Sequence, residues 1–396
     1  MSFSFLKKEP MLSFVFDIRD SSISIAAVRF QKERKPEIVL CQSFEFKRQN
    51  IKDHGAHLSS MMKTLDDGAI SVRKRLIRIG NKEKIGTHYF FVGSPWSVSQ
   101  SKTLKITKGR SFEINNSLLE KIIVGEELLA ESYLERQTKQ KKWEILEERI
   151  LQMKLNGFRV DDFFGKKASS LIIEHFVSFI PSELGNKISS FVDERLGKNI
   201  KRQSNSCILS SYSFLRDLYS DRNDFIYIDI GKLITDIYIV RDDIILGVAS
   251  IPFGEEKIIE TSLSKTNLSR DVFLSHLSIG HDKNFDLTSH NNGLDLLKTG
   301  FGLWEKNLKD VLLKTCSGVN MPNEMLIVPN DLISNMFISK LLNKGNDKQF
   351  KILNSSVKVS VITESEMNNF IINGRAFVSE PYIKMDLVFL DKLLKQ

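Results

Sequence analysis

A small group of acidic, hydroxyl and glycine residues near position 230 has the side chains that a phosphate-binding turn needs. Asp229 follows the apolar run 225–228, Gly231 stands two residues later, and Thr235 and Asp236 follow. Backbone N–H groups of a glycine turn can bind phosphate, and carboxylates can hold Mg²⁺ through water. An ordinary hairpin with a surface acid explains the same residues equally well, so this stretch alone leaves both interpretations open.

The flanking residues predict the elements that would position this group. Three short apolar runs rich in β-branched residues lie at 225–228, 237–240 and 244–251, and Arg241-Asp242-Asp243 separate the last two. Short runs divided by turn residues are typical of an antiparallel meander of strands. Asp229 would then lie at the end of the first strand of this meander.

A second copy of the pattern lies near the N-terminus. Residues 12–30 comprise an apolar run that ends at Asp17, a polar turn at 19–22, and a second apolar run; residues 37–46 predict a third strand. Two meanders, each with an acid at the end of its first strand, favour a duplicated, two-lobed phosphate-binding α/β fold.

These two stretches resemble the phosphate loops of the actin-like ATPase superfamily, with 12–30 as the first loop and 225–254 as the second. The family pattern at the second loop is DxGGGTTD, where x is any residue. This chain has DIGKLITD at 229–236 and lacks the two middle glycines. The resemblance implies an α/β, two-lobed actin-like (duplicated ribonuclease-H-like) fold. It also implies ATP and Mg²⁺ as cofactors.

The resemblance further implies which side chains would line the nucleotide site. The metal would be held by Asp17, Asp229 and Asp236. Nucleotide contacts would come from Asp17, Arg19, Ser21, Ser22, Asp229, Gly231, Lys232, Thr235, Asp236, Pro329 and Asn330.

Three positions depart from the family pattern. Arg19 occupies a glycine position of the first loop, where it would either contribute a positive charge or obstruct the phosphate. The second loop keeps one glycine of three, and Pro329-Asn330 replace the glycine turn that lies against the adenosine. Proline fixes φ, and side chains replace the bare backbone of glycine. We therefore expect weak or absent ATP binding and no significant hydrolysis, and the sequence identifies no catalytic residue.

The region between the two loops predicts a separate module at 98–178. Its expected order is strand, helix, strand, strand, with a turn at Asn156-Gly157 and a helix that begins after Asn115 or Asn116 and runs to about Gln137. This module resembles the α+β domain inserted in the PilM and FtsA branch of the family. The chain would then divide into the first lobe at 1–97 and 179–222, the insert at 98–178, and the second lobe at 223–396 with its smaller subdomain at 255–320.

The C-terminal segment 382–395 predicts a helix. Its apolar residues run around most of the helix, which favours a helix packed in the second lobe over a membrane anchor.

Composition excludes several other classes of protein. With 396 residues, 41% of them hydrophobic and 27% charged, the chain can form at least two cores. Three distant cysteines argue against a disulfide framework and suggest a reducing compartment, and neither a signal peptide nor a membrane span is expected. The net charge of +8 is spread along the chain without a basic motif, so no nucleic-acid partner is expected.

The resemblance to the PilM and FtsA branch implies a cytoplasmic scaffold of the PilM kind as the expected function. It would dock on the cytoplasmic tail of an inner-membrane protein of the type IV pilus machinery, and its association with the membrane would be peripheral and indirect. An FtsA-like division protein and a sugar-kinase-type phosphotransferase are the alternatives. The second needs a positioned carboxylate base and a sugar pocket, and no motif for either is recognised. Self-association and filament formation stay open.

Overall fold

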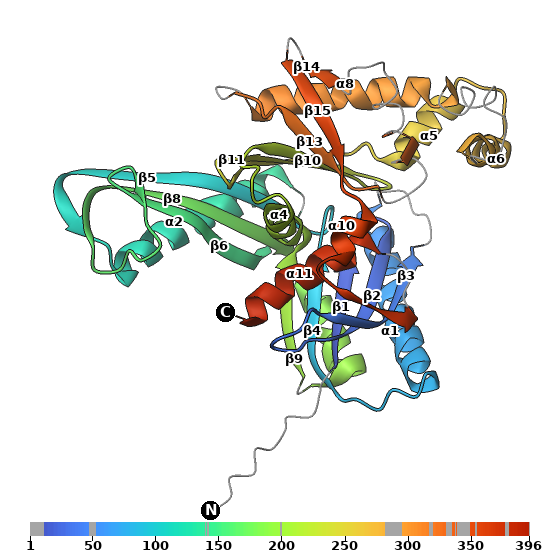
Figure 1. Cartoon of the computed structure of the whole chain (residues 1–396), viewed down its shortest axis with the longest axis horizontal. Coiled ribbons are helices and arrows are strands. Elements are labelled where there is room, and N and C mark those ends of the chain that lie inside the picture. Colours follow the sequence, from blue (N-terminus) through green and yellow to red (C-terminus); the bar gives the residue numbers. More distant parts are fainter. Residues whose placement is uncertain are drawn as a thin grey trace, which may run out of the picture. The chain divides into compact units, whose positions relative to one another are not determined.

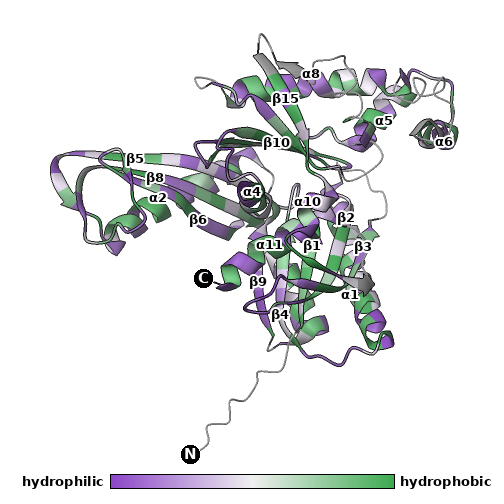
Figure 2. Ribbon diagram, viewed as in Figure 1, coloured by the Kyte–Doolittle hydropathy of each residue, from purple (hydrophilic) through white to green (hydrophobic). Residues whose placement is uncertain are grey.

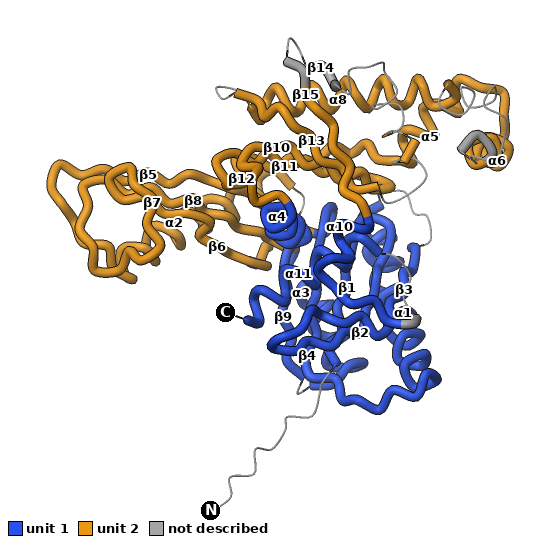
Figure 3. The backbone as a smooth tube through the Cα atoms, viewed as in Figure 1, with its two compact units in different colours: residues 1–96, 181–218, 364–396 blue, residues 97–180, 219–363 orange. Residues whose placement is uncertain are grey.

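The computed structural model describes residues 12–46, 53–138, 140, 142–198, 200–281, 295–316, 320–329, 335–336, 338, 349–352, 355–376 and 380–395. The chain forms two compact units, which Figure 3 shows in different colours. Unit 1 contains residues 1–96, 181–218 and 364–396, and unit 2 contains residues 97–180 and 219–363.

Unit 1 is built on a six-stranded sheet of order β16-β3-β2-β1-β4-β9 (Figure 1). Strands β1, β2 and β3 form an antiparallel meander. On the other side of β1, strands β4 and β9 continue the sheet in parallel. The strands are β1 (Leu12–Ile18), β2 (Ser22–Arg29), β3 (Glu37–Glu45), β4 (Ile85–Val92), β9 (Lys201–Ser206) and β16 (Ile372–Ala376).

Helices cover both faces of this sheet. On one face, α1 (His54–Arg78) brings Gly68 against Phe44 and Ile25, and α3 (Ser182–Phe191) brings Phe191 against Phe16. A π-helical turn, η1 (Val192–Gly197), extends α3. The opposite face carries α4 (Cys207–Leu218) and α11 (Pro381–Lys395), and the short α10 (Glu364–Asn368) packs against α11.

Unit 2 contains a second six-stranded sheet of order β12-β11-β10-β13-β15-β14. Here too a meander of three antiparallel strands is followed by two parallel neighbours, so the duplication expected from the sequence is confirmed. Asp242 and Asp243 both have positive φ in the predicted turn of this meander. The strands are β10 (Phe225–Ile230), β11 (Thr235–Arg241), β12 (Ile244–Ile251), β13 (Glu324–Ile327), β14 (Gln349–Ile352) and β15 (Ser355–Val361).

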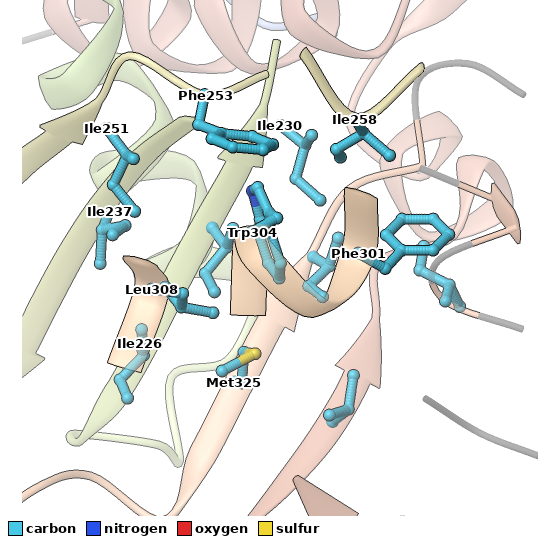
Figure 4. Close-up of a cluster of buried hydrophobic side chains, with 14 of the residues drawn as sticks. Ile226, Ile230, Ile237, Ile251, Phe253, Ile258, Phe301, Trp304, Leu308 and Met325 are labelled. Atoms are coloured by element: carbon cyan, nitrogen blue, oxygen red, sulfur yellow. The ribbon is translucent and has the colours of Figure 1, made fainter. Parts of the chain in front are cut away.

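Two helices, α5 (Glu255–Leu263) and α8 (Lys298–Thr315), lie on one face of this second sheet, and α6 (Arg270–His281) follows α5 in the chain (Figure 1). The side chains between helices and sheet form one apolar core, drawn in Figure 4 around Trp304. Alternate strand residues supply it because successive side chains of a strand point to opposite faces. Its members include Ile226, Ile228, Ile230, Ile237, Ile239, Ile258, Phe301, Trp304 and Leu308.

The region between the two meanders forms a four-stranded sheet of order β5-β8-β6-β7 with one long helix, α2 (Asn116–Gln137). Asn115 caps the helix by accepting from the N–H of Leu118 at 3.0 Å, and Asn156 and Gly157 both have positive φ, as their turn requires. The strands are β5 (Val98–Glu113), β6 (Trp143–Leu155), β7 (Phe158–Arg159) and β8 (Lys167–Pro181). In sequence, residues 97–180 interrupt unit 1, but their contacts place them in unit 2.

The C-terminal segment corrects the prediction that all of 223–396 belongs to the second lobe. Residues 364–396 lie in unit 1, where β16 pairs with β3 and Phe389 of α11 contacts Phe91 of β4. Residues 382–390 are all buried, so this part of α11 has no exposed face and needs partners on all sides. In Figure 2 the same helix mixes hydrophobic and hydrophilic residues. None of the helices in the described part of the chain is long and apolar enough to cross a membrane.

Candidate functional site

In the first predicted loop, an internal ion pair occupies the position where the family has a glycine. Arg19 Nε donates to Asp17 Oδ2 at 3.0 Å, and the Arg19 guanidinium carbon lies 3.4 Å from the centre of the Tyr382 ring. Asp17 and Tyr382 are buried, and Arg19 is 16% exposed. The guanidinium therefore points into unit 1, where it has both an anionic and an aromatic partner.

Two further carboxyl groups of unit 1 interact electrostatically with the same ion pair. Asp386 of α11 is fully buried and accepts a hydrogen bond from the Ser210 hydroxyl at 2.6 Å. Burial, and then the charge of Asp17, raise the pKa of Asp386, and the same two causes raise the pKa of Glu380 to about 7. Arg19 opposes both shifts but is a single cation among three acids. We call Asp17, Arg19, Glu380 and Asp386 the acid cluster.

The backbone of the first turn also has internal partners. The N–H of Arg19 donates to the carbonyl of Ser22 at 3.0 Å, and the carbonyl of Arg19 accepts from Trp96 Nε1 at 2.6 Å. Ser21 accepts from the N–H of Phe46 through its carbonyl at 2.8 Å. Ser21 and Ser22, both predicted to contact nucleotide, are half-buried in this turn.

In the second predicted loop, the backbone is closed against the start of α5. The N–H of Gly231 donates to the carbonyl of Ile234 at 2.8 Å. The carbonyls of Gly231 and Lys232 accept from the N–H groups of Glu255 and Glu256 at 3.0 and 2.8 Å. These two donors belong to the first turn of α5, so the loop satisfies helix N–H groups that would otherwise be available to an anion.

Thr235, the hydroxyl residue of the predicted phosphate motif, lies in the core of unit 2. Its side chain is fully buried; the hydroxyl donates to the carbonyl of Phe253 at 2.8 Å and accepts from Trp304 Nε1 at 2.9 Å. Figure 4 shows Trp304 and Phe253 in this core. A threonine hydroxyl has one proton to donate. That proton is directed to Phe253, so the hydroxyl has none left for a phosphate oxygen.

Asp229 and Asp236 are the predicted metal ligands that the structure brings together. They are paired directly across β10 and β11, and Asp236 is paired in turn with Ser250 of β12. Directly paired residues of antiparallel strands share a face, so the three side chains form one row. The Ser250 hydroxyl donates to Asp236 Oδ1. Asp229 is 5% exposed.

The remaining predicted residues divide between the units. Asp17 lies in unit 1, whereas its predicted partners Asp229 and Asp236 lie in unit 2. Pro329, which follows β13, is half-buried in unit 2. Asn330 lies outside the described residues.

The sequence did not predict the residues from other parts of the chain that interact with Asp17, Arg19 and Thr235 of these loops. Trp304 lies on α8, Tyr382 and Asp386 lie on α11, and Glu380 directly precedes α11. No spacing links these residues to Asp17 or Thr235. One signal was available. Charged residues stand within the apolar sequence of 382–390, and such residues are buried only when they have partners.

Comparison with known proteins gives the fold. No family model matches the sequence, and no curated protein matches it. Among solved structures, a chain of a PilM-PilN type IV pilus biogenesis complex matches with a TM-score of 0.59 and 12% identity, over 96% of both chains. The chain therefore has the actin-like ATPase fold, as the sequence predicted.

Two other solved structures match with lower scores. A protein of actin-like ATPase fold and unknown function from Bacteroides thetaiotaomicron has a TM-score of 0.43 and 11% identity, over 98% of this chain and 99% of that one. The ethanolamine utilization protein EutJ from Carboxydothermus hydrogenoformans has a TM-score of 0.42 and 9% identity, over 89% and 86% of the two chains.

Proposed function

We propose that this chain is a PilM-like scaffold of actin-like fold that works without a functioning nucleotide site. It acts in the cytoplasm, peripherally at the inner membrane, and docks on the cytoplasmic tail of a membrane protein of the type IV pilus machinery. The similarity to PilM over nearly the whole chain supports the choice of partner. The hydrogen bonds of Thr235 carry the proposal that nucleotide binding is weak or lost.

The loops support this loss at the level of individual groups. Arg19 pairs with Asp17, the carbonyls of Gly231 and Lys232 bind the start of α5, and Thr235 donates to Phe253. A lost hydrogen bond to a charged group typically weakens binding by about 1.5–3 kcal/mol. Two such losses lower affinity by roughly a hundredfold or more.

The insert supports a docking role through its surface. It exposes large apolar side chains on α2, on β7 and in the loop that precedes β8, and exposed apolar patches often mark sites where another protein binds. Those that are more than half exposed are Leu128, Leu129, Tyr133, Phe158 and Phe164. We propose that this surface takes part in binding the membrane protein's tail.

Calorimetry of the full chain with Mg-ATP tests the nucleotide half of the proposal. We expect no binding in the micromolar range and no hydrolysis above background. Sub-micromolar binding that disappears in Asp229→Ala would show that the site works and would overturn this half.

The scaffold half is tested by crosslinking the full chain in cells and identifying the membrane protein that is captured. A synthetic peptide of its cytoplasmic tail is then titrated against the purified chain. We expect Leu129→Glu to weaken peptide binding at least tenfold. Ile77→Glu, a matched change at an exposed apolar residue of α1, should have no effect. Peptides from pilus proteins that bind no better than a scrambled sequence would contradict the pilus role, and binding to a division protein instead would favour the FtsA-like alternative.

A further inference from the structure

The inserted module contains a cluster of one histidine and two glutamates that the proposed scaffold role does not use. Glu127 lies on α2, Glu148 on β6 and His175 on β8, and one ligand atom from each lies within 4.8 Å of the other two. All three elements belong to unit 2. Helix α2 runs beside this sheet in Figure 1. The cluster thus joins the helix to two neighbouring strands.

His175 is a polar break in an otherwise apolar row. Alternate residues of β8 point toward α2, and this row consists of Leu171, Ile173, His175, Val177 and Phe179. The first two belong to an apolar cluster with Leu119 of α2, and the last two to a second cluster with Ala130 and Leu134. His175 therefore lies between two apolar clusters, beneath the middle of the helix.

The polar atoms of this cluster are incompletely satisfied. His175 is 1% exposed, and its Nε2 lies 3.4 Å from Glu148 Oε1 but forms no hydrogen bond within the described part of the chain. Glu127 Oε1 is buried and likewise lacks a hydrogen bond there. Buried polar atoms are rarely left in this state, and a bound water or ion is a common partner for such atoms. Here the two residues belong to a group whose ligand atoms lie within 4.8 Å of one another.

We propose that Glu127, Glu148 and His175 bind one divalent transition-metal ion, with Zn²⁺ as the preferred ion. Imidazole nitrogen and carboxylate oxygen are both common zinc ligands, and three protein ligands leave a fourth position for water or a further group. Mg²⁺ and Ca²⁺ prefer sites made entirely of oxygen ligands, so the histidine selects against them. The ion would hold α2 on the sheet at the gap between the two apolar clusters.

The charges nearby are compatible with a cation. Glu126, the neighbour of Glu127, is paired with Lys102 and so contributes little net charge. Burial and the adjacent Glu148 carboxylate raise the pKa of Glu127, and burial lowers the pKa of His175. Burial is the larger cause in both cases and disfavours the charged form of each group, while the Glu148 carboxylate opposes the shift of His175.

The test is calorimetric titration of the full chain, after treatment with a chelator, with Zn²⁺ alone. We expect one Zn²⁺ per chain for the wild type, and binding that is lost or at least tenfold weaker in Glu127→Gln and in His175→Gln. Matched controls that should bind as the wild type does are Glu120→Gln, on the exposed side of α2, and His54→Gln, an exposed histidine of α1. Mg²⁺ and Ca²⁺ should give no comparable signal.

Two results would overturn the proposal. The first is a wild-type chain, folded by circular dichroism, that binds no Zn²⁺; this result does not depend on whether any variant folds. The second is unchanged Zn²⁺ binding in both ligand variants, which would place the ion elsewhere, for instance at the buried cysteines. Bound Zn²⁺ should also raise the melting temperature of the wild type but not of Glu127→Gln, because only a ligand of the folded state stabilises it.

Discussion

The indole N–H of Trp304 donates a hydrogen bond of 2.9 Å to the hydroxyl of Thr235, although 69 residues separate them. The hydroxyl in turn donates a hydrogen bond to the carbonyl of Phe253. The sequence assigns this threonine to phosphate binding. In the structure it links β11, α8 and the residues that directly follow β12 inside unit 2. The motif residue is kept, and its role in this fold is to satisfy buried polar groups.

The first prediction follows from this relationship. Thr235→Val keeps the shape of the side chain but removes the hydroxyl, which leaves the Trp304 N–H and the Phe253 carbonyl without this partner. A buried polar group that loses its partner costs about 1–3 kcal/mol. We expect the free energy of unfolding to fall by that amount or more, as measured by urea denaturation.

Thr107→Val is the matched control, because Thr107 is an exposed threonine on a strand of the same unit. It should change the free energy of unfolding by no more than about 0.5 kcal/mol. Equal stability of Thr235→Val and the wild type would show that the two hydrogen bonds contribute nothing.

The second prediction concerns pH and the acid cluster of unit 1. The pKa of Glu380 is about 7 in the folded chain against an ordinary value of 4.5. Between these two values the folded state holds a proton that the unfolded state has released. The stability that this group contributes therefore falls as the pH rises from about 4.5 to about 7, by on the order of 3 kcal/mol in total.

Glu380→Gln removes the titrating group and keeps a neutral amide of similar shape. The variant should match the wild type near pH 5 and be more stable above pH 7, as measured by urea denaturation across this range. Glu33→Gln, at an exposed glutamate of the same unit, should follow the wild type throughout. A stability difference between wild type and Glu380→Gln that is constant with pH would contradict the raised pKa.

The local features of the fold could be read from the sequence, because they depend on residues close together in the chain. The Asn115 cap, the Asn156-Gly157 turn and the Asp242-Asp243 turn each follow from side-chain or backbone chemistry within a few positions, and the structure contains all three. The duplicated meander was visible for the same reason. Its two copies repeat an apolar strand, an acid and a turn.

The contacts that determine the site could not be read in this way. The helix that contains Tyr382 and Asp386 was expected in the second lobe. Its apolar pattern predicts that it is buried, but the pattern does not identify the sheet against which it packs. It packs in unit 1, where Lys384 is fully buried and pairs with Glu364 at 2.8 Å. The cluster of Glu127, Glu148 and His175 has no motif spacing at all. These pairings come from tertiary packing.

The last prediction concerns Gly254, which holds the second loop in place. A Cβ at this position would lie 2.4 Å from the carbonyl oxygen of Gly231 and 2.7 Å from the backbone nitrogen of Ile234. The backbone of Gly254 has φ −105° and ψ −162°, which other residues also adopt, so the obstacle is contact alone. Both neighbouring atoms are backbone, and neither can move without shifting the loop.

Gly254→Ala should therefore lower the free energy of unfolding by about 1–3 kcal/mol, as overpacking in a core usually does. Gly302→Ala is the matched control in the same unit. An added Cβ at 302 meets nothing within 4 Å, and alanine is a better helix former than glycine, so this change in α8 should raise stability by about 0.5–1 kcal/mol. Urea denaturation of the two variants should thus give shifts of opposite sign. A neutral or stabilising Gly254→Ala would mean that the loop is not held against the start of α5 as the hydrogen bonds of Gly231 and Lys232 indicate.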